Sequence, residues 1–353
     1  MILLRTLSAL GLPLVTRLNP EFAHTLTINA LSRVHDATPE PDDPRLRVQA
    51  LGLDFPNPIG LAAGFDKNAA ATEAMLSFGF GFVEAGTVTP RPQEGNPKPR
   101  IFRLREDRAI VNRLGFNNEG LQAARERLTR LQGRPGIRGI NIGANKDTND
   151  RIADYVTGLK ELGPFASYVT VNISSPNTPG LRGLQNKTEL QTLLTALGET
   201  KSKLARKIPM LVKIAPDLDD HACADIAELA LAHKLDGLIV SNTTIARPST
   251  LKNRHANETG GLSGAPLFVR STAVLRQVRR LTQGKLTLIG VGGISSGADA
   301  FAKIKAGATL VQLYTALTFE GAGLVTRIKR ELLDLLEREQ FGSVAEAIGR
   351  DVD

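Results

Sequence analysis

The feature that most constrains the fold of this chain is a theme that recurs along it: a short apolar strand, a turn of Gly, Asn, Ser or Thr, and then a helical stretch. Continuous apolar strands that alternate with helices are typical of a parallel sheet covered by helices. Eight such units over about 250 residues predict a closed (β/α)8 TIM barrel, an α/β fold, rather than an open sheet. The predicted strands are 58–63, 82–88, 139–143, 168–172, 210–215, 237–242, 286–291 and 310–314.

Helical periodicity fills most of the intervals between these strands. One segment, residues 100–115, does not follow this alternation of strands and helices. Its apolar and polar residues alternate, which predicts a hairpin inserted after the second strand. An amphipathic stretch at 327–339 indicates that residues 320–353 form terminal helices on the barrel. The predicted helices between strands are 118–132, 187–207, 221–234, 265–282 and 297–306.

Two short helices are predicted before the barrel. The first has leucines at helical spacing and is broken or kinked by Pro13. The second begins at Asn19-Pro20-Glu21, where a capping residue, a proline and an acid occupy the first turn. The leucines of the first helix are Leu3, Leu7, Leu10, Leu14 and Leu18, and the second carries Ala23, Leu26, Ala30 and Val34 on one face.

The chain therefore divides into residues 1–44, a small helical domain that ends in the proline- and acid-rich linker 37–44, and residues 45–353, the barrel with its C-terminal helices. The N-terminal helices either dock on the protein or dip into a membrane surface, and the sequence leaves both readings open. A secretory signal is disfavoured because no small-x-small cleavage site follows. No apolar run reaches the roughly 18–20 residues that span a bilayer.

Composition excludes several other classes of function. The single cysteine, Cys223, excludes a disulfide framework, and five scattered histidines without metal-ligand spacing predict no metal site. The net charge is +8, but the basic residues are dispersed and the chain has no tryptophan. A nucleic-acid surface with stacking aromatics is therefore not indicated.

In a barrel of this type the active site lies at the carboxyl ends of the strands. Those ends are rich in amides, hydroxyls, glycines and lysines, and we expect Asp66 and Asp217 to be the only acids close by. This disfavours a two-carboxylate hydrolase and a magnesium site held by acids. It favours a large, planar, anionic ligand such as a cofactor with a phosphate. The glycine-rich turn at 290–297 and the pair 314–315 follow strands seven and eight, where barrels commonly bind phosphate.

Nine segments stand out in order along the barrel: LAAGFDKNA (61–69), EAGTVTPRPQEGNPKPR (84–100), NRLGFNNEG (112–120), NIGANKDT (141–148), VNISSPNTPGLRGLQ (171–185), VKIAPDL (212–218), SNTT (241–244), TGGLSGAPL (259–267) and GVGGISSGADA (290–300). In them the chain closely resembles the membrane-associated, quinone-dependent (class 2) dihydroorotate dehydrogenases. The resemblance implies a flavin-binding barrel preceded by a small helical domain.

The resemblance also implies roles for individual residues. One FMN per chain would accept a hydride from (S)-dihydroorotate while Ser175 takes a proton, which yields orotate in de novo pyrimidine (UMP) biosynthesis. FMN would be bound at Ala63, Gly64, Phe65, Asp66, Lys67, Thr87, Asn141, Asn172, Lys213, Ser241, Gly264, Gly293, Tyr314 and Thr315. The substrate would be bound at Lys67, Asn112, Arg113, Leu114, Gly115, Phe116, Asn172, Asn177, Asn242 and Thr243.

A serine with no histidine nearby is a weak base, so we expect Thr178 or a chain of waters to carry its proton away. Class 1 relatives have cysteine at this position. Three departures from the family's pattern are Ser241 for threonine and Thr315 for serine, which keep the hydroxyl, and Phe65 for an aliphatic residue.

The family's partners follow by the same resemblance. A membrane quinone would enter through an apolar tunnel formed by the N-terminal helices and reoxidise the flavin. The protein would be a monomer attached peripherally to the cytoplasmic face of the cell (inner) membrane. Two other classes stay open: a phosphate-binding isomerase or lyase without flavin, which usually needs a carboxylate that the strand ends lack, and a membrane-docked binding protein without catalysis.

Overall fold

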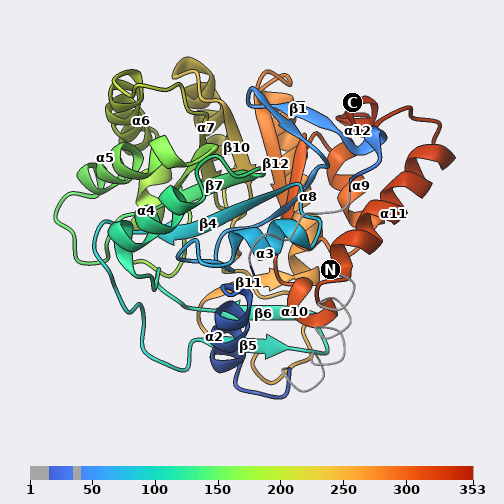
Figure 1. Cartoon of the computed structure of the whole chain (residues 1–353), viewed down its shortest axis with the longest axis horizontal. Coiled ribbons are helices and arrows are strands. Elements are labelled where there is room, and N and C mark those ends of the chain that lie inside the picture. The colour runs from blue at the N-terminus through green and yellow to red at the C-terminus, as the bar shows by residue number, and fades with distance from the viewer. Residues whose placement is uncertain (1–15, 35–40, 353) are drawn as a thin grey trace.

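The computed structural model describes residues 16–34 and 41–352. Eight parallel strands form a closed barrel in the order β10-β12-β13-β3-β4-β7-β8-β9 (Figure 1). The predicted (β/α)8 barrel is therefore confirmed, and each strand lies within two residues of its predicted bounds. The strands are β3 Ile59–Leu61, β4 Phe82–Val88, β7 Ile137–Ile142, β8 Tyr168–Asn172, β9 Met210–Ile214, β10 Gly237–Val240, β12 Thr287–Val291 and β13 Leu310–Leu313.

Helices surround the barrel (Figure 1). The five predicted between strands are present as α4 Gly120–Arg130, α6 Lys187–Ser202, α7 Asp220–Ala232, α8 Phe268–Leu281 and α9 Gly297–Lys305. The C-terminal helices are α10 Leu317–Glu320, α11 Leu324–Arg338 and α12 Val344–Ala347. Two further helices, α3 Thr72–Ser77 and α5 Arg151–Leu162, were not among those predicted. The sequence does carry a start signal for α5, because the Asp150 carboxylate accepts a hydrogen bond from the N–H of Ala153 (3.0 Å).

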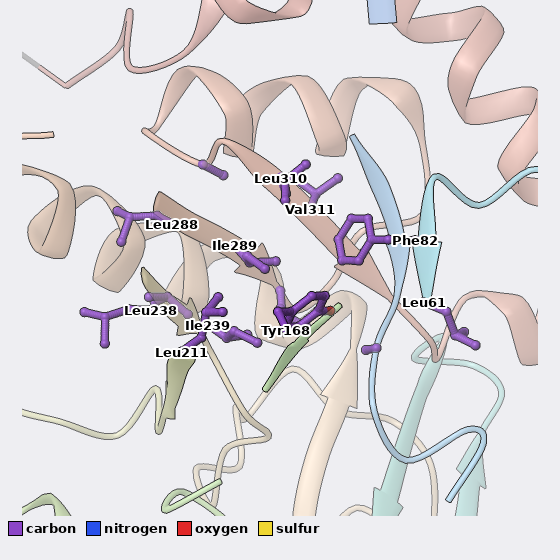
Figure 2. Packing of buried hydrophobic residues seen from close by; sticks show 14 of the residues in the cluster. Leu61, Phe82, Tyr168, Leu211, Leu238, Ile239, Leu288, Ile289, Leu310 and Val311 are labelled. Carbon is purple, nitrogen blue, oxygen red and sulfur yellow. The ribbon is translucent and has the colours of Figure 1, made fainter. Parts of the chain in front are cut away.

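Buried side chains of the barrel strands pack together, among them the aromatic rings of Phe82 and Tyr168 (Figure 2). Each of these two rings lies against a glycine. A Cβ at Gly60 would lie 2.2 Å from the Phe82 ring, and one at Gly139 would lie 2.1 Å from the Tyr168 ring. The centroids of these two rings are 6.3 Å apart. Glycine at the two positions therefore makes room for the rings, which pack the core in place of a channel.

Two small antiparallel sheets flank the barrel at opposite ends (Figure 1). A hairpin of β1 Val48–Ala50 and β2 Leu53–Phe55 lies at one end, where Phe55 packs against Phe82 with ring centroids 5.2 Å apart. At the other end, β5 Ile101–Leu104 and β6 Ala109–Asn112 form the predicted inserted hairpin. A third strand, β11 Gly261–Gly264, adds to β6 and was not predicted as a strand.

The N-terminal helix α2, Pro20–Leu31, begins where the sequence predicted. Asn19 Oδ1 accepts hydrogen bonds from the N–H groups of Glu21 (3.0 Å) and Phe22 (3.3 Å). Of the apolar residues that the sequence places on one face of this helix, Ala23 is buried, but Leu26 and Ala30 are exposed. The residues that pack against the core are Ile28 and Leu31, because apolar residues occur on both sides of this helix and periodicity alone does not select one.

The predicted leucine-rich first helix lies outside the described residues, except for Leu18. None of the helices within 16–34 and 41–352 is long and apolar enough to cross a membrane.

Candidate active site

A cavity opens at the carboxyl ends of the barrel strands, beneath the three-stranded sheet β11-β6-β5. Residues from seven of the eight barrel strands or from the loops that follow them line this cavity, as expected for the barrel fold. Most of the predicted site residues are brought together here. Those that line the cavity are Ala63, Gly64, Lys67, Thr87, Asn112, Leu114, Gly115, Phe116, Asn172, Ser175, Asn177, Lys213, Ser241, Asn242, Thr243, Gly264, Gly293, Tyr314 and Thr315.

Four predicted residues do not line the cavity: Phe65, Asp66, Asn141 and Arg113. The buried Asp66 carboxylate accepts hydrogen bonds from three N–H groups of its own loop, at distances of 2.7–3.3 Å, so it shapes that loop. Burial raises the pKa of Asp66. Arg113 turns the other way, toward Glu258 (2.8 Å), so its side chain does not reach the cavity.

A buried carboxylate that the sequence did not identify, that of Glu84 in β4, lies inside the barrel. It accepts four hydrogen bonds, from Asn141 Nδ2 (2.8 Å), Tyr168 OH (3.0 Å), Thr170 Oγ1 (3.1 Å) and Gln312 Nε2 (2.9 Å). The expectation that Asp66 and Asp217 are the only acids close by is therefore wrong. The partners that satisfy Glu84 come from β7, β8 and β13, so no local pattern in the sequence marks it.

A chain of hydrogen bonds leads from Glu84 to the cavity wall. A carboxylate only accepts, so the amide group of Asn141 must donate to it, which leaves Asn141 Oδ1 to accept from Thr87 Oγ1 (2.6 Å). Thr87 Oγ1 then accepts from Asn172 Nδ2 (2.9 Å), and Asn172 Oδ1 accepts from Asn242 Nδ2 (3.3 Å). Glu84 thereby fixes which way each amide faces.

Lys213 of β9 lies beside Asn172, its partner in the β8–β9 ladder, and lines the cavity. Burial lowers the pKa of Lys213, whereas the negative charge of Glu84 raises it. The cavity wall thus contains a buried cation whose charge is supported by the carboxylate inside the barrel.

The loop after β8 carries Ser175 into the cavity. Ser175 Oγ accepts a hydrogen bond from the N–H of Asn177 (3.2 Å), and no His, Asp or Glu in the described ranges hydrogen-bonds to it. Thr178 Oγ1 is buried and has no hydrogen-bond partner. Arg182 holds the loop in place: it donates to the Ser174 carbonyl (3.0 Å) and pairs with Asp217 (2.9 Å).

Lys67 lines the cavity near helix α2. Its Nζ lies 3.3 Å from Nε2 of His24, a residue of α2 that the sequence did not identify. Burial lowers the pKa of Lys67 to about 8. Burial, with a further contribution from Lys67, lowers the pKa of His24 to about 3, so the imidazole is neutral and can accept a hydrogen bond from the ammonium. The His24 ring also packs edge-on against Phe65 (5.5 Å).

Two glycine-containing turns line the cavity, the turn at 290–297 that was predicted to bind phosphate and a second turn at Gly264. Gly264, Gly292 and Gly293 have φ angles of +94°, +107° and +79°, a region that favours glycine, and all three line the cavity. Helix α8 begins at Phe268, directly after the turn that contains Gly264. Backbone N–H groups of such turns and of a helix N-terminus bind anions, so this donor set fits a phosphate. Arg108, another lining residue, was not predicted.

Comparison with known proteins agrees with this geometry. The family model described as "Dihydroorotate dehydrogenase" matches residues 45–336. The chain is 56% identical over 345 residues to a dihydroorotate dehydrogenase (quinone) of Parvibaculum lavamentivorans, with 98% of each chain covered. It is 52% identical over 347 residues to that of Rhodospirillum rubrum, covering 97% of this chain and 94% of the relative.

Solved structures give the same result. The chain is similar to ligand-free DHODH from Eimeria tenella, with a TM-score of 0.91, 44% identity and coverage of 95% of this chain and 99% of that one. It is also similar to the Eimeria tenella DHODH in complex with ferulenol, with a TM-score of 0.90, 43% identity and coverage of 94% and 95%.

Proposed function

This chain belongs to the dihydroorotate dehydrogenase family, in its quinone-dependent class, and on that premise we propose that its barrel cavity oxidises (S)-dihydroorotate to orotate with FMN as the bound cofactor. The reaction serves pyrimidine biosynthesis. The observation that carries the proposal is the joint presence, in one cavity, of a serine without a charged partner, a cation at each of two walls and a glycine turn suited to phosphate.

FMN is supported by the donor set of the cavity. Its phosphate fits the turns at Gly264 and Gly292-Gly293. Lys213 suits the negative charge that develops on a reduced flavin ring, and the oriented Thr87 hydroxyl and Asn172 amide suit its polar edge. When bound, FMN supplies the hydride acceptor of the reaction. The Asn141 side chain acts indirectly, through Thr87.

The substrate is a small ring with a carboxylate and two amide edges. Lys67 would neutralise the carboxylate as a point charge. Asn112, Asn177, Asn242 and Thr243 would match the amide edges, because asparagine offers both a donor and an acceptor without adding charge. In support, Asn177 Nδ2 donates to Asn112 Oδ1 (3.3 Å), which holds an amide of the loop after β8 beside one at the end of β6.

Ser175 would remove the proton from the carbon next to the substrate carbonyl. Its hydroxyl proton must leave at the same time, since a neutral serine has no other place for a second proton. Thr178 Oγ1 is a suitable acceptor for this proton. It belongs to the same loop as Ser175, is buried and has no hydrogen-bond partner. A water between the two hydroxyls would complete the path.

Substrate capture is expected to weaken at high pH. Lys67 attracts a carboxylate only when protonated, and its pKa is about 8. Above about pH 8, kcat/KM for dihydroorotate should therefore fall by up to about tenfold per pH unit. Lys67→Met should lower kcat/KM by about 10- to 100-fold and remove this dependence. A Lys67→Met enzyme with the original pH profile would assign the titration to another group.

The N-terminal region is proposed to serve the quinone. Leu18, just before helix α2, and Phe22 and Leu26 on it form an apolar stripe, and the three residues are 39%, 60% and 47% exposed. Such a stripe suits contact with a membrane surface, from which a quinone can enter. This supports peripheral attachment to a membrane through residues 1–44, with 45–353 as the catalytic domain. By the family resemblance we propose that the protein is a monomer and that the membrane surface is the cytoplasmic face of the cell membrane.

Deleting residues 1–36 is expected to spare flavin reduction by dihydroorotate but to abolish turnover with a hydrophobic quinone. The reduction half-reaction, followed by flavin absorbance, serves as the internal control for folding. The matched point variant Phe22→Asn with Leu26→Asn should weaken binding to lipid vesicles while leaving the half-reaction unchanged. Unaltered quinone kinetics in the deleted protein would contradict the proposed route.

One experiment tests the proposed function as a whole. Purified protein should show flavin absorbance, which bleaches when dihydroorotate is added without oxygen and returns when a quinone is added. A colourless protein would contradict the FMN assignment and would favour an isomerase or lyase that binds only phosphate. A coloured protein that does not bleach would contradict the substrate.

A further inference from the structure

Lys303 of α9 is a buried lysine that the proposed mechanism does not use. Its side chain is 0% exposed, and its Nζ donates hydrogen bonds to Ser271 Oγ (2.8 Å) and Thr272 Oγ1 (3.0 Å) of α8. The Phe268 ring centroid lies 5.1 Å from Nζ. No carboxylate in the described ranges forms an ion pair with it. Burying an amine without an acid is costly unless something else stabilises its charge.

The lysine lies directly behind the phosphate turn. Ser271 Oγ, which accepts from Lys303, is 3.2 Å from the carbonyl oxygen of Gly292. A Cβ at Gly290 would lie 3.2 Å from Lys303 Cδ, and one at Gly293 would lie 2.5 Å from Cβ of Phe268. Lys303 and the turn therefore share the same packing layer, with the cavity on the opposite side of the turn.

The surroundings of Lys303 accommodate both a neutral and a charged amine. Thr272 donates its hydroxyl proton to the Phe268 carbonyl (2.7 Å), and the Ser271 hydroxyl lies within reach of the carbonyls of Phe268 and Gly292. Both hydroxyls therefore accept from Nζ, and a neutral amine has the two N–H groups required. A third proton would point toward the face of the Phe268 ring, where a cation is favourable.

The charged groups around Lys303 do not fix its protonation state, so a ligand bound nearby can change it. Burial lowers its pKa to about 7, and the Asp299 carboxylate, one turn earlier in α9, raises it. Helix α8 presents only hydroxyls and a ring to Nζ, and β12 presents Gly290. Two acids of α11 and its C-terminal end contact other residues of α9: Glu331 accepts a hydrogen bond from the N–H of Gly297, and Glu339 pairs with Lys305.

We propose that Lys303 is a positioning residue that provides the counter-charge for the cofactor phosphate: it takes up a proton when the phosphate dianion binds in front of the Gly292-Gly293 turn. This rests on the proposed use of FMN. A phosphate brings negative charge into a region where burial alone disfavours the ammonium, so ligand binding and protonation stabilise each other. The consequence is selectivity for a phosphorylated flavin over one without phosphate.

The first test compares FMN with riboflavin, which lacks the phosphate, on the full chain after its flavin has been removed. Calorimetric titration at about pH 8, in two buffers of different ionisation enthalpy, measures protons taken up on binding. At this pH the phosphate of free FMN is already a dianion, so it contributes no proton of its own. FMN should take up about 0.5–1 proton more than riboflavin. Equal uptake by the two flavins would overturn the proposal.

The second test uses Lys303→Met, with Lys305→Met as the matched control. Lys305 lies on the same helix but pairs with Glu339 (3.0 Å) away from the turn. Lys303→Met should weaken FMN binding about 10- to 100-fold, leave riboflavin binding unchanged and remove the extra proton uptake. Lys305→Met should leave all three unchanged. Equal weakening of both flavins would mean that Lys303 only supports packing. If the unmodified chain bound no flavin, the proposed function itself would fail, whereas FMN binding without the linked proton defeats only the role of Lys303.

Discussion

Replacing Ser175 by alanine is expected to slow the reduction of bound flavin by dihydroorotate by about 10²- to 10⁴-fold, the usual contribution of a general base. The cofactor should stay bound, because the residues proposed to bind the flavin ring and its phosphate are unchanged. Ser175 Oγ accepts a hydrogen bond from Asn177 N–H, so its lone pairs are oriented by the loop itself. Alanine removes the oxygen without disturbing the carbonyls that Arg182 holds.

Stopped-flow absorbance without oxygen measures this step directly, apart from quinone turnover. The control is Ser175→Cys, which keeps a proton acceptor of similar size and should restore part of the rate. Because a cysteine thiol has a pKa of about 8.5, the rate of this variant should rise toward alkaline pH as the thiolate forms. A near-normal rate for Ser175→Ala would remove the serine from the role of base.

The sequence predicts the barrel well because the strands are continuous apolar runs and most of them are followed by a helix with its own periodicity. These are local signals. In a closed barrel the carboxyl ends of all strands lie at the same end, which is why the sequence alone assigns residues as distant as Lys67 and Thr315 to one cavity.

What the sequence did not predict depends on contacts between distant segments. Strand β11 has the sequence GLSG, which has no strand signal of its own, and it is a strand because β6 pairs with it. His24 gains its role from the packing of α2 against Lys67, and the inward face of α2 depends on the same packing. Strand β4, with the sequence FVEAGTV, contains a single acidic residue, Glu84. Nothing in this sequence indicates that the Glu84 carboxylate points into the barrel.

The buried carboxylate of Glu84 leads to the second large expected effect. Glu84→Ala should lower the free energy of unfolding by about 3–5 kcal/mol, because it leaves a cavity and four donors without their acceptor. It should also release FMN, since Asn141 is then free to turn and the orientation of Thr87 and Asn172 is lost. Thermal unfolding and the fluorescence of released flavin measure the two effects.

Glu84→Gln separates the charge of this residue from its hydrogen bonds. Its Oε1 can still accept from Asn141, while its Nε2 replaces the oxygen that accepts from Gln312, Tyr168 and Thr170. The Gln312 amide can rotate so that its unpartnered Oε1 accepts one N–H of this group, and one of the two hydroxyls can rotate to accept the other. The chain of oriented amides and most of the stability should therefore survive. The lost charge no longer supports the ammonium of Lys213, whose pKa burial already lowers, so flavin reduction should slow at a lower pH than in the unmodified enzyme. If the glutamine variant were as unstable as the alanine variant, the charge rather than the orientation of the amides would be what the barrel requires.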